Sequence, residues 1–280
     1  MKTSSSFSSS SSSSKGNICS RTRTRTRTRR RTRRILPIGA FAVLLLAALG
    51  AAAQTTNGLS DKEIQGRQLV EKLLAEQPAE NFTNTGVLEI RADKGSKSNF
   101  TFQCQVVVSA SNWSIHYLTP TNSFPPASNA IIAVISHTTG QPNSYYLHEG
   151  FCGLVLSNTQ TAIPFASSDF WICDLGLEFL HWPAQKILKG DTARGRLCKV
   201  LESTNPDPST NGYSRVLSWI DNETLGILKA EAYDAKGKLL KEFLPKDIKK
   251  VNGQWQVQSM EIRNVQTKSR TQLVLDSKAK

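Results

Sequence analysis

Asn99-Phe-Thr-Phe-Gln-Cys-Gln-Val-Val-Val108 is the stretch that decides the fold. Its even-numbered residues are apolar from Phe100 to Val108, whereas the residues between them are polar as far as Gln105. A period of two places alternate side chains on opposite sides of a β-strand, so the stretch is predicted to be a half-buried strand with one apolar face. After Ser109-Ala-Ser111 the pattern repeats, with Trp113, Ile115 and Tyr117 on the apolar side.

Further strand-like runs fill most of the remaining sequence. They span residues 131–137, 144–148, 154–157, 198–203, 213–221, 225–233, 238–243, 254–264 and 270–275. Turn signals such as Pro125-Pro126, Asn211-Gly212 and Asn252-Gly253 separate them. Hairpin turns at this density favour an antiparallel meander over parallel β-α-β units, because a parallel connection needs a long crossover.

Two segments do not follow the strand pattern. Residues 59–77 are predicted to form a helix, because Ser60 and Glu63 make a capping box at its start and Pro78 follows its end. At about 1.5 Å per residue this helix would be about 28 Å long, enough to lie across a sheet or a barrel mouth. Residues 164–183 hold several aromatic side chains and are predicted to form an insert of loops with a short helix.

The positive charge of the chain is concentrated at its N-terminal end. Residues 1–53 contain 11 of the 35 Lys and Arg and none of the 22 Asp and Glu, so the remainder is almost neutral. A charge block confined to one end gives no support for nucleic-acid binding by the folded domain.

The N-terminal segment is predicted to be a signal peptide with a Ser-rich and Arg-Thr-rich leader. The apolar run 35–49 is followed by Ala51 and Ala53, which predicts cleavage near Ala53 and a periplasmic protein with a single domain over residues 54–280. The choice between Sec and twin-arginine export stays open. The alternative is an uncleaved membrane anchor, but 15 residues are short of the roughly 20 that a spanning helix needs.

Four cysteines follow the leader, namely Cys104, Cys152, Cys173 and Cys198. In an exported protein we expect at least one disulfide among them, and the three possible pairings of four cysteines stay open. No Cys-x-x-Cys motif is present, so we expect no structural zinc site.

Catalytic and cofactor motifs are missing from the sequence. There is no Gly-x-Ser-x-Gly, no His-Glu-x-x-His and no complete phosphate-binding loop, and the four histidines occur singly. We therefore expect a binding protein that has no catalytic residue and needs no cofactor or metal ion. The alternative is an enzyme for a small molecule, with its acids and bases drawn from Asp169, Asp174, His116 and His181.

The second half of the chain carries a family resemblance in a series of motifs. They are Asp169-Phe-Trp-Ile-Cys-Asp-Leu175, Cys198-Lys-Val-Leu-Glu-Ser203, Tyr213-Ser-Arg-Val-Leu-Ser-Trp-Ile-Asp221, Ala230-Glu-Ala-Tyr-Asp-Ala-Lys-Gly-Lys-Leu-Leu-Lys-Glu-Phe243, and Ile248-Lys-Lys-Val-Asn-Gly-Gln-Trp255 followed by Met260-Glu-Ile-Arg-Asn264 and Thr267-Lys-Ser-Arg-Thr271. In this order they resemble the bacterial outer-membrane lipoprotein-sorting proteins, the LolA-like family. The resemblance implies a mainly β, α+β fold: a single curved antiparallel sheet that forms an unclosed barrel, with the N-terminal helix and the short helical insert covering its mouth.

The resemblance further implies a monomeric periplasmic carrier that holds the acyl chains of lipoproteins, or another lipid, in an apolar cavity. Its partners would be an inner-membrane releasing complex and an outer-membrane acceptor. Exposing a chain of roughly 15 carbons to water costs on the order of 12 kcal/mol, at about 0.8 kcal/mol per methylene, so such transport needs an enclosed site. The alternative on the same scaffold is an RseB-like regulatory module that senses the state of the cell envelope.

We expect ten residues to line the cavity. They are Phe100, Phe102, Val106, Trp113, Ile115 and Tyr117 on the sheet, Val70 and Leu73 on the helix, and Phe179 and Trp182 on the insert. The alternative for each is packing against the others with no ligand between them, since alternation marks an inward face in either case. The family's polar lid latch has no matching arginine here, because residues 98–185 contain no Lys or Arg.

Overall fold

The computed structural model describes residues 58–119, 131–149, 152–157, 160–208, 212–251 and 254–276. All described residues lie in one compact unit, the second unit of the chain, Thr56–Lys280. The predicted signal peptide and its cleavage site near Ala53 lie outside the described residues.

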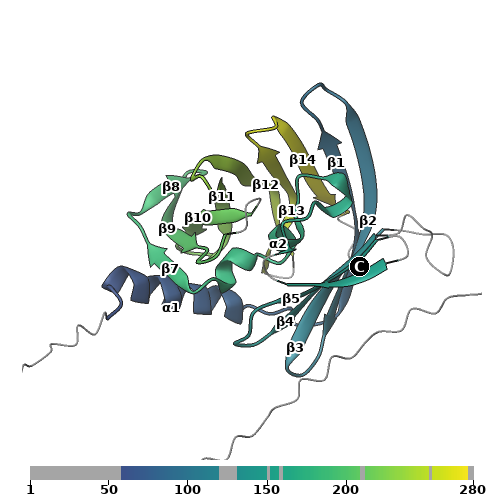
Figure 1. Ribbon diagram of the computed structural model, residues 1–280. Helices are drawn as coiled ribbons and strands as arrows, with labels where there is room; N and C mark the ends of the chain where they lie inside the picture. The colour runs from purple at the N-terminus through teal and green to yellow at the C-terminus, as the bar shows by residue number, and fades with distance from the viewer. Residues whose placement is uncertain are drawn as a thin grey trace, which may run out of the picture. The chain divides into compact units, whose positions relative to one another are not determined.

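A single antiparallel sheet of 14 strands forms most of the second unit (Figure 1). Its strands are β1 (Phe82–Arg91), β2 (Lys97–Val108), β3 (Asn112–Leu118), β4 (Ile131–Thr138), β5 (Ser144–Glu149), β6 (Cys152–Leu156), β7 (Ala184–Ile187), β8 (Asp191–Ala193), β9 (Arg196–Thr204), β10 (Tyr213–Asp221), β11 (Ile227–Asp234), β12 (Leu239–Val251), β13 (Gln254–Asn264) and β14 (Ser269–Leu275). The order across the sheet is β6-β5-β4-β3-β2-β1-β14-β13-β12-β11-β10-β9-β7, with β8 paired to β9. Since β6 and β7 do not pair with each other, the barrel is unclosed, as expected.

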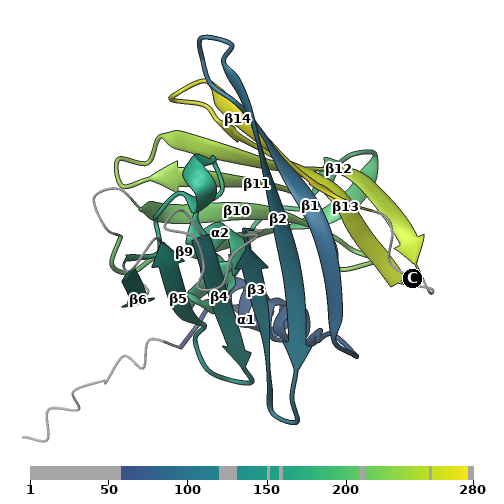
Figure 2. The same ribbon diagram turned by 90° about the vertical axis from the view of Figure 1, so that its right-hand side faces the viewer.

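The first and last strands meet in the middle of the sheet. β1 pairs with β14 in a register that runs from Gly86 opposite Leu275 to Arg91 opposite Arg270. Strands β1 to β6 therefore form one half of the sheet, and β7 to β14 form the other (Figure 2).

The alternation that predicted β2 is present in the structure. Phe102 and Val106 are buried, whereas Thr101, Gln103 and Gln105 on the other side of the strand are exposed. The inward face of β2 belongs to one large hydrophobic core that also contains inward residues of the C-terminal half, such as Phe243.

The N-terminal helix α1 spans Asp61–Ala75, two residues shorter at each end than the sequence predicted. At its start the backbone of Ser60 is extended and its N–H donates to Glu63 Oε2 at 2.8 Å, which is the bond that the Glu of a capping box makes to the residue before the helix. At its end Glu76 is already extended, ahead of Pro78, which disfavours helical backbone in the residue before it.

Helix α1 packs against β7, the edge strand of the C-terminal half (Figure 1). Gly66 makes this close approach possible, since a Cβ at this position would lie 2.7 Å from the backbone of Gln185 and Lys186. The helix therefore covers an edge that would otherwise expose unpaired backbone groups.

The predicted insert, residues 164–183, lies against the inner face of the sheet and contributes to its core. It holds two short 3-10 helices, Phe165–Ser167 and Glu178–His181, and the short helix α2 (Ile172–Leu175). Its buried apolar side chains are Phe165, Ala166, Phe170, Ile172, Cys173, Phe179 and Leu180. Part of the volume that the sheet encloses is therefore filled by the protein itself.

The expected disulfide is not formed among the described cysteines. Cys104 on β2, Cys173 on α2 and Cys198 on β9 are free thiols, and the side chain of Cys152 lies outside the described part. Cys173 and Cys198 are buried in two separate hydrophobic clusters, so packing places them apart.

Candidate functional site

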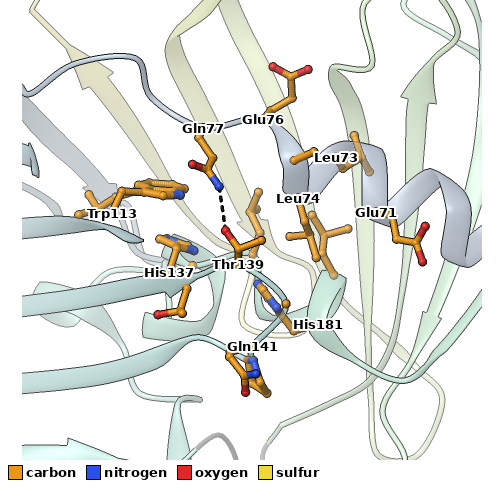
Figure 3. A pocket seen from close by; sticks show the side chains of 18 of the residues that line it. Glu71, Leu73, Leu74, Glu76, Gln77, Trp113, His137, Thr139, Gln141 and His181 are labelled. Carbon is orange, nitrogen blue, oxygen red and sulfur yellow. Dashed lines mark hydrogen bonds between the residues drawn. The ribbon is translucent and has the colours of Figure 1, made fainter. Parts of the chain in front are cut away.

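A cavity of about 620 Å³ lies between the C-terminal part of α1, strands β3 and β4, and the insert (Figure 3). Its lining residues are Glu71, Leu73, Leu74, Ala75, Glu76 and Gln77 from α1 and the segment after it, Trp113 and Ile115 from β3, the segment 137–142, and Leu175, Gly176, Leu177, Leu180 and His181 from the insert. This volume falls within the roughly 300–1,000 Å³ that small-molecule sites occupy.

The wall of the cavity exposes more apolar than polar surface, and its aliphatic side chains come from three elements. Leu73 and Leu74 project from α1, Ile115 from the sheet, and Leu177 and Leu180 from the insert. Leu74 and Leu177 are large apolar side chains that remain 38% and 40% exposed, which leaves their surface available to a ligand. An apolar wall built from three separate elements suits an aliphatic ligand.

One hydrogen bond joins the helix side of the cavity to the sheet side. Gln77 Nε2 donates to Thr139 Oγ1 at 3.2 Å, so the segment that follows α1 is tied to the turn after β4 (Figure 3). Gly140 has a φ of 72°, a left-handed conformation that favours glycine and allows the tight turn. Both partners are exposed, so this bond is a contact that water can replace.

Trp113 and His137 form the aromatic side of the cavity. Their rings stack with centroids 3.9 Å apart and an interplanar angle of 14°. His137 Nε2 is buried and has no hydrogen-bond partner among the described residues. Burial lowers the pKa of His137 to about 4, His181 nearby acts in the same direction and the Asn143 side chain opposes both, so the imidazole is neutral at neutral pH.

The insert is held at the floor of the cavity by two side chains of the sheet half. Asn143 Nδ2 donates to the carbonyl of Gly176 at 2.8 Å, and the Tyr145 hydroxyl donates to the Glu178 carboxylate. A Cβ at Gly176 would lie 2.6 Å from the Tyr145 hydroxyl, so only glycine fits there. Burial raises the pKa of Glu178 to about 7 although the Tyr145 hydrogen bond lowers it.

Leu177 adopts a strained backbone between these two contacts. Its φ is 48°, a left-handed conformation that costs a side chain with a Cβ about 1–2 kcal/mol. The bonds at Gly176 and Glu178 on either side fix this geometry, and Leu177 lines the cavity. Strain of this kind is common at binding sites, where a rigid surrounding holds one residue in place.

A buried ionic cluster anchors the other end of the insert. Lys241 Nζ on β12 donates to the carbonyl oxygen of Asp169 at 2.6 Å and to Asp174 Oδ2 at 3.3 Å. The same ammonium lies 3.5 Å from the ring centroid of Trp171, and the Tyr213 hydroxyl donates to Asp174 Oδ1 at 2.8 Å. The cluster occupies the inside of the C-terminal half, next to packed side chains.

A smaller cavity of about 250 Å³ adjoins the first, and Pro142 and His181 line both. Its other walls come from the insert, including Cys173 and Trp182, and from the segment around Asn205. Burial raises the pKa of Cys173 well above its usual value, so this thiol is not activated as a nucleophile.

The ten residues predicted to line a cavity are split between cavity wall and core. Leu73, Trp113 and Ile115 line the larger cavity, and Trp182 lines the smaller one. Phe102, Val106, Val70 and Phe179 are buried, and Phe100 and Tyr117 are partly buried against the core. Tyr117 lies between Phe102 and Phe165, with ring centroids 6.1 and 5.8 Å away, so the insert occupies the space next to it.

The four residues considered as acids or bases do not form one site. Asp169 and Asp174 both belong to the Lys241 cluster, whereas His181 lines the cavities. His116 Nε2 shares a hydrogen bond of 2.9 Å with Ser114 on β3. No group of three or more His, Cys, Asp or Glu with the arrangement of a metal site occurs in the part of the chain that the structure describes.

Sequence reasoning missed three residues that build the site: Lys241, His137 and Gln77. Lys241 could have been found, because it precedes Phe243 by two positions and therefore shares its inward face. His137 ends a predicted strand, but nothing in the sequence indicates its stacking on Trp113. Gln77 was predicted as the last helical residue, and its role depends on the chain leaving the helix at Glu76.

Solved structures with the same fold come from several bacteria. A DUF1329 family protein from Desulfovibrio piger is 17% identical with a TM-score of 0.64, over 78% of this chain and 92% of that chain. A putative outer membrane lipoprotein-sorting protein domain from Vibrio parahaemolyticus is 20% identical with a TM-score of 0.64, over 77% and 92%. A LolA superfamily protein from Nitrosomonas europaea is 15% identical with a TM-score of 0.54, over 78% and 93%. The fold is LolA-like.

The C-terminal half of this LolA-like fold is the part that matches a family by sequence. A family model described as "Uncharacterized protein" matches residues 155–279, which contain the insert and strands β7 to β14. No curated protein sequence matches the chain. Within the described residues, no helix has both the length and the apolar character to cross a membrane.

Proposed function

We propose that this protein is a periplasmic binding protein that carries the acyl chains of lipoproteins, or of another lipid, in the cavity beneath α1. The observation that carries the proposal is the cavity of about 620 Å³, whose aliphatic wall comes from α1, the sheet and the insert together. The LolA-like fold supports it, since one neighbour with this fold is described as an outer membrane lipoprotein-sorting domain.

The cavity wall supplies the driving force for binding. Each methylene that moves from water onto the aliphatic surface gains about 0.8 kcal/mol. Leu74 and Leu177 already expose apolar surface to the cavity, so a ligand covers them without displacing a packed side chain. The cavity also reaches the surface near the Gln77–Thr139 bond, which is exposed and can open at low cost for entry and release.

The proposed role includes no chemical step by the protein itself. Asp169 and Asp174 are engaged by Lys241, and the thiol of Cys173 has a raised pKa, which supports a passive carrier. Loading and release then depend on partners. We propose an inner-membrane releasing complex and an outer-membrane acceptor for these steps, with the protein acting as a monomer.

A matched pair of substitutions on α1 tests the proposal. Leu74→Trp places a large ring inside the cavity, whereas Ile64→Trp changes a residue of similar exposure on the same helix outside it. The measurement is the affinity of the purified mature protein, freed of lipid, for a neutral fluorescent acyl ester. We expect Leu74→Trp to weaken binding at least about tenfold and Ile64→Trp to leave it unchanged, because only the first ring competes with the chain.

Two results would overturn the proposal. The first is an unmodified protein that binds neither the acyl ester nor a purified lipoprotein. The second is an equal effect of both substitutions, which would place binding elsewhere. Circular dichroism and the unfolding midpoint of each variant show whether its fold is intact.

A further inference from the structure

We infer that the cavity selects acyl groups without a negative charge, such as ester- or amide-linked chains, over the anions of free fatty acids and phospholipids. This inference rests on the proposed function and adds the chemical class of the ligand. It follows from the distribution of charged side chains around the cavity.

The described cavity wall contains no cationic residue. Its only charged side chains are Glu71 and Glu76, both on the helix side. The sheet strands and the insert that form the rest of the wall fall within residues 98–185, which contain no Lys or Arg anywhere in the sequence. A ligand carboxylate or phosphate would therefore meet no opposite charge on this wall.

The cationic side chains Arg67 and Lys72 of helix α1 lie outside the cavity. Lys72 lines a different surface pocket together with Ile187 and Lys199, and Arg67 lines another with Leu59 and Pro183. Glu71 and Glu76 are the charged side chains that this helix and its end present to the cavity. Arg67 and Lys72 therefore lie outside the cavity, whereas the exposed carboxylates of Glu71 and Glu76 line it.

The two histidines of the wall do not supply a positive charge. Burial lowers the pKa of both, to about 4 for His137, so each is a neutral hydrogen-bonding group near pH 7. His137 Nε2 is buried without a partner among the described residues. Because this nitrogen is enclosed by protein atoms, it is not a contact for the ligand, and neither histidine offers an anion a positive charge.

An anionic head group would lose its hydration at this wall and gain no ion pair in return. Burying a carboxylate without a partner is costly, and the carboxylates of Glu71 and Glu76 add repulsion. A neutral ester of the same chain keeps the full apolar contribution and avoids both costs. Chain length and charge should therefore act independently on affinity.

Two competitors with the same 12-carbon chain, laurate and glyceryl monolaurate, test the inference. The measurement is the affinity with which each displaces a neutral fluorescent acyl ester from the mature protein at pH 8. We expect the monolaurate to bind at least about tenfold more tightly, a difference of about 1.4 kcal/mol. Equal affinities, or tighter binding of laurate, would overturn the inference while the proposed function stands. Failure of the fluorescent ester itself to bind would overturn the proposed function.

A charge reversal at the rim provides the second arm. Glu76→Lys brings a cation to the cavity, whereas Glu80→Lys makes the same change of net charge at an exposed residue four positions later that does not line it. We expect Glu76→Lys to reduce the preference for monolaurate over laurate at least about threefold, and Glu80→Lys to retain it. An identical shift in both variants would assign the preference to net charge and would overturn the role of the cavity wall.

Discussion

The ammonium of Lys241 on β12 lies 3.3 Å from Asp174 Oδ2 in α2, and the two side chains are 0% and 2% exposed. Burial lowers the pKa of Lys241, whereas the Asp174 carboxylate favours its charged form. The pair joins the insert to the C-terminal half of the sheet, whereas Asn143 and Tyr145 hold the insert at the floor of the cavity.

Removing the charge of Lys241 should therefore destabilise the protein strongly. We expect Lys241→Met to lower the free energy of unfolding by about 3–5 kcal/mol, because it leaves the buried carboxylate of Asp174 without its partner. Urea unfolding measures the change. Asp174→Asn in the same background should recover part of the loss, and a double mutant as unstable as the sum of the two single mutants would show that the pair is not coupled.

Glu178 should make the protein less stable as pH rises through 7. Its pKa is raised from 4.5 to about 7 in the folded state, so the folded protein binds the proton more tightly than the unfolded chain. The stability that this proton contributes is therefore complete below pH 4.5 and is lost as pH rises from 4.5 to about 7. Glu178→Gln removes this titration. We therefore expect the free energy of unfolding of the variant, relative to that of the parent, to be about 2–3 kcal/mol higher at pH 8 than at pH 5, as measured by urea unfolding at both values. A pH-independent difference between variant and parent would contradict this assignment.

His137 should make the protein less stable as pH falls below 6.5, which is the opposite pH dependence to that of Glu178. Its pKa falls from 6.5 to about 4 on folding, so protonation below pH 6.5 favours the unfolded chain. His137→Phe keeps an aromatic ring against Trp113 and removes the titration. We expect this variant to lose less stability than the parent between pH 6.5 and pH 4, by up to about 3 kcal/mol in urea unfolding. Parallel stability profiles for the two proteins would rule out His137 as the cause.

Leu177 should show a conflict between stability and binding. Leu177→Asn suits the left-handed backbone at this position better than leucine, because asparagine adopts that region more readily. We expect the unfolding midpoint to stay the same or rise, while affinity for the fluorescent acyl ester falls because an apolar wall residue is lost. Leu154→Asn is the matched control, since Leu154 is an exposed leucine on β6 outside the cavity. A lower midpoint together with unchanged affinity in Leu177→Asn would contradict both expectations.

Local patterns in the sequence predicted most of the sheet. Alternation placed Phe102 and Val106 inward, and the capping box located the start of α1 within two residues. These features depend on neighbouring residues and on backbone geometry, which a single sequence contains. The meander and its unclosed barrel follow from the density of turns together with the family resemblance.

The position of the cavity could not be predicted in the same way. An inward side chain such as Phe102 packs or lines a space depending on what lies opposite, and here Tyr117 and the insert lie there. Contacts such as Asn143 with Gly176 join segments 33 residues apart and leave no periodic signal. The observed cavity therefore lies closer to the end of α1 than predicted, where Leu74 and Leu177 remain exposed.

The pairing of β1 with β14 joins residues near the start of the described domain to residues near its end. Six registered pairs, from Gly86–Leu275 to Arg91–Arg270, connect the two halves at this seam. Contacts between residues so distant in sequence form slowly. Because this seam needs β14, the sheet is completed only after that strand has been synthesised. A nascent chain would thus keep this seam open until β14 has been made, and truncation before Ser269 would leave the two half-sheets without their backbone pairing.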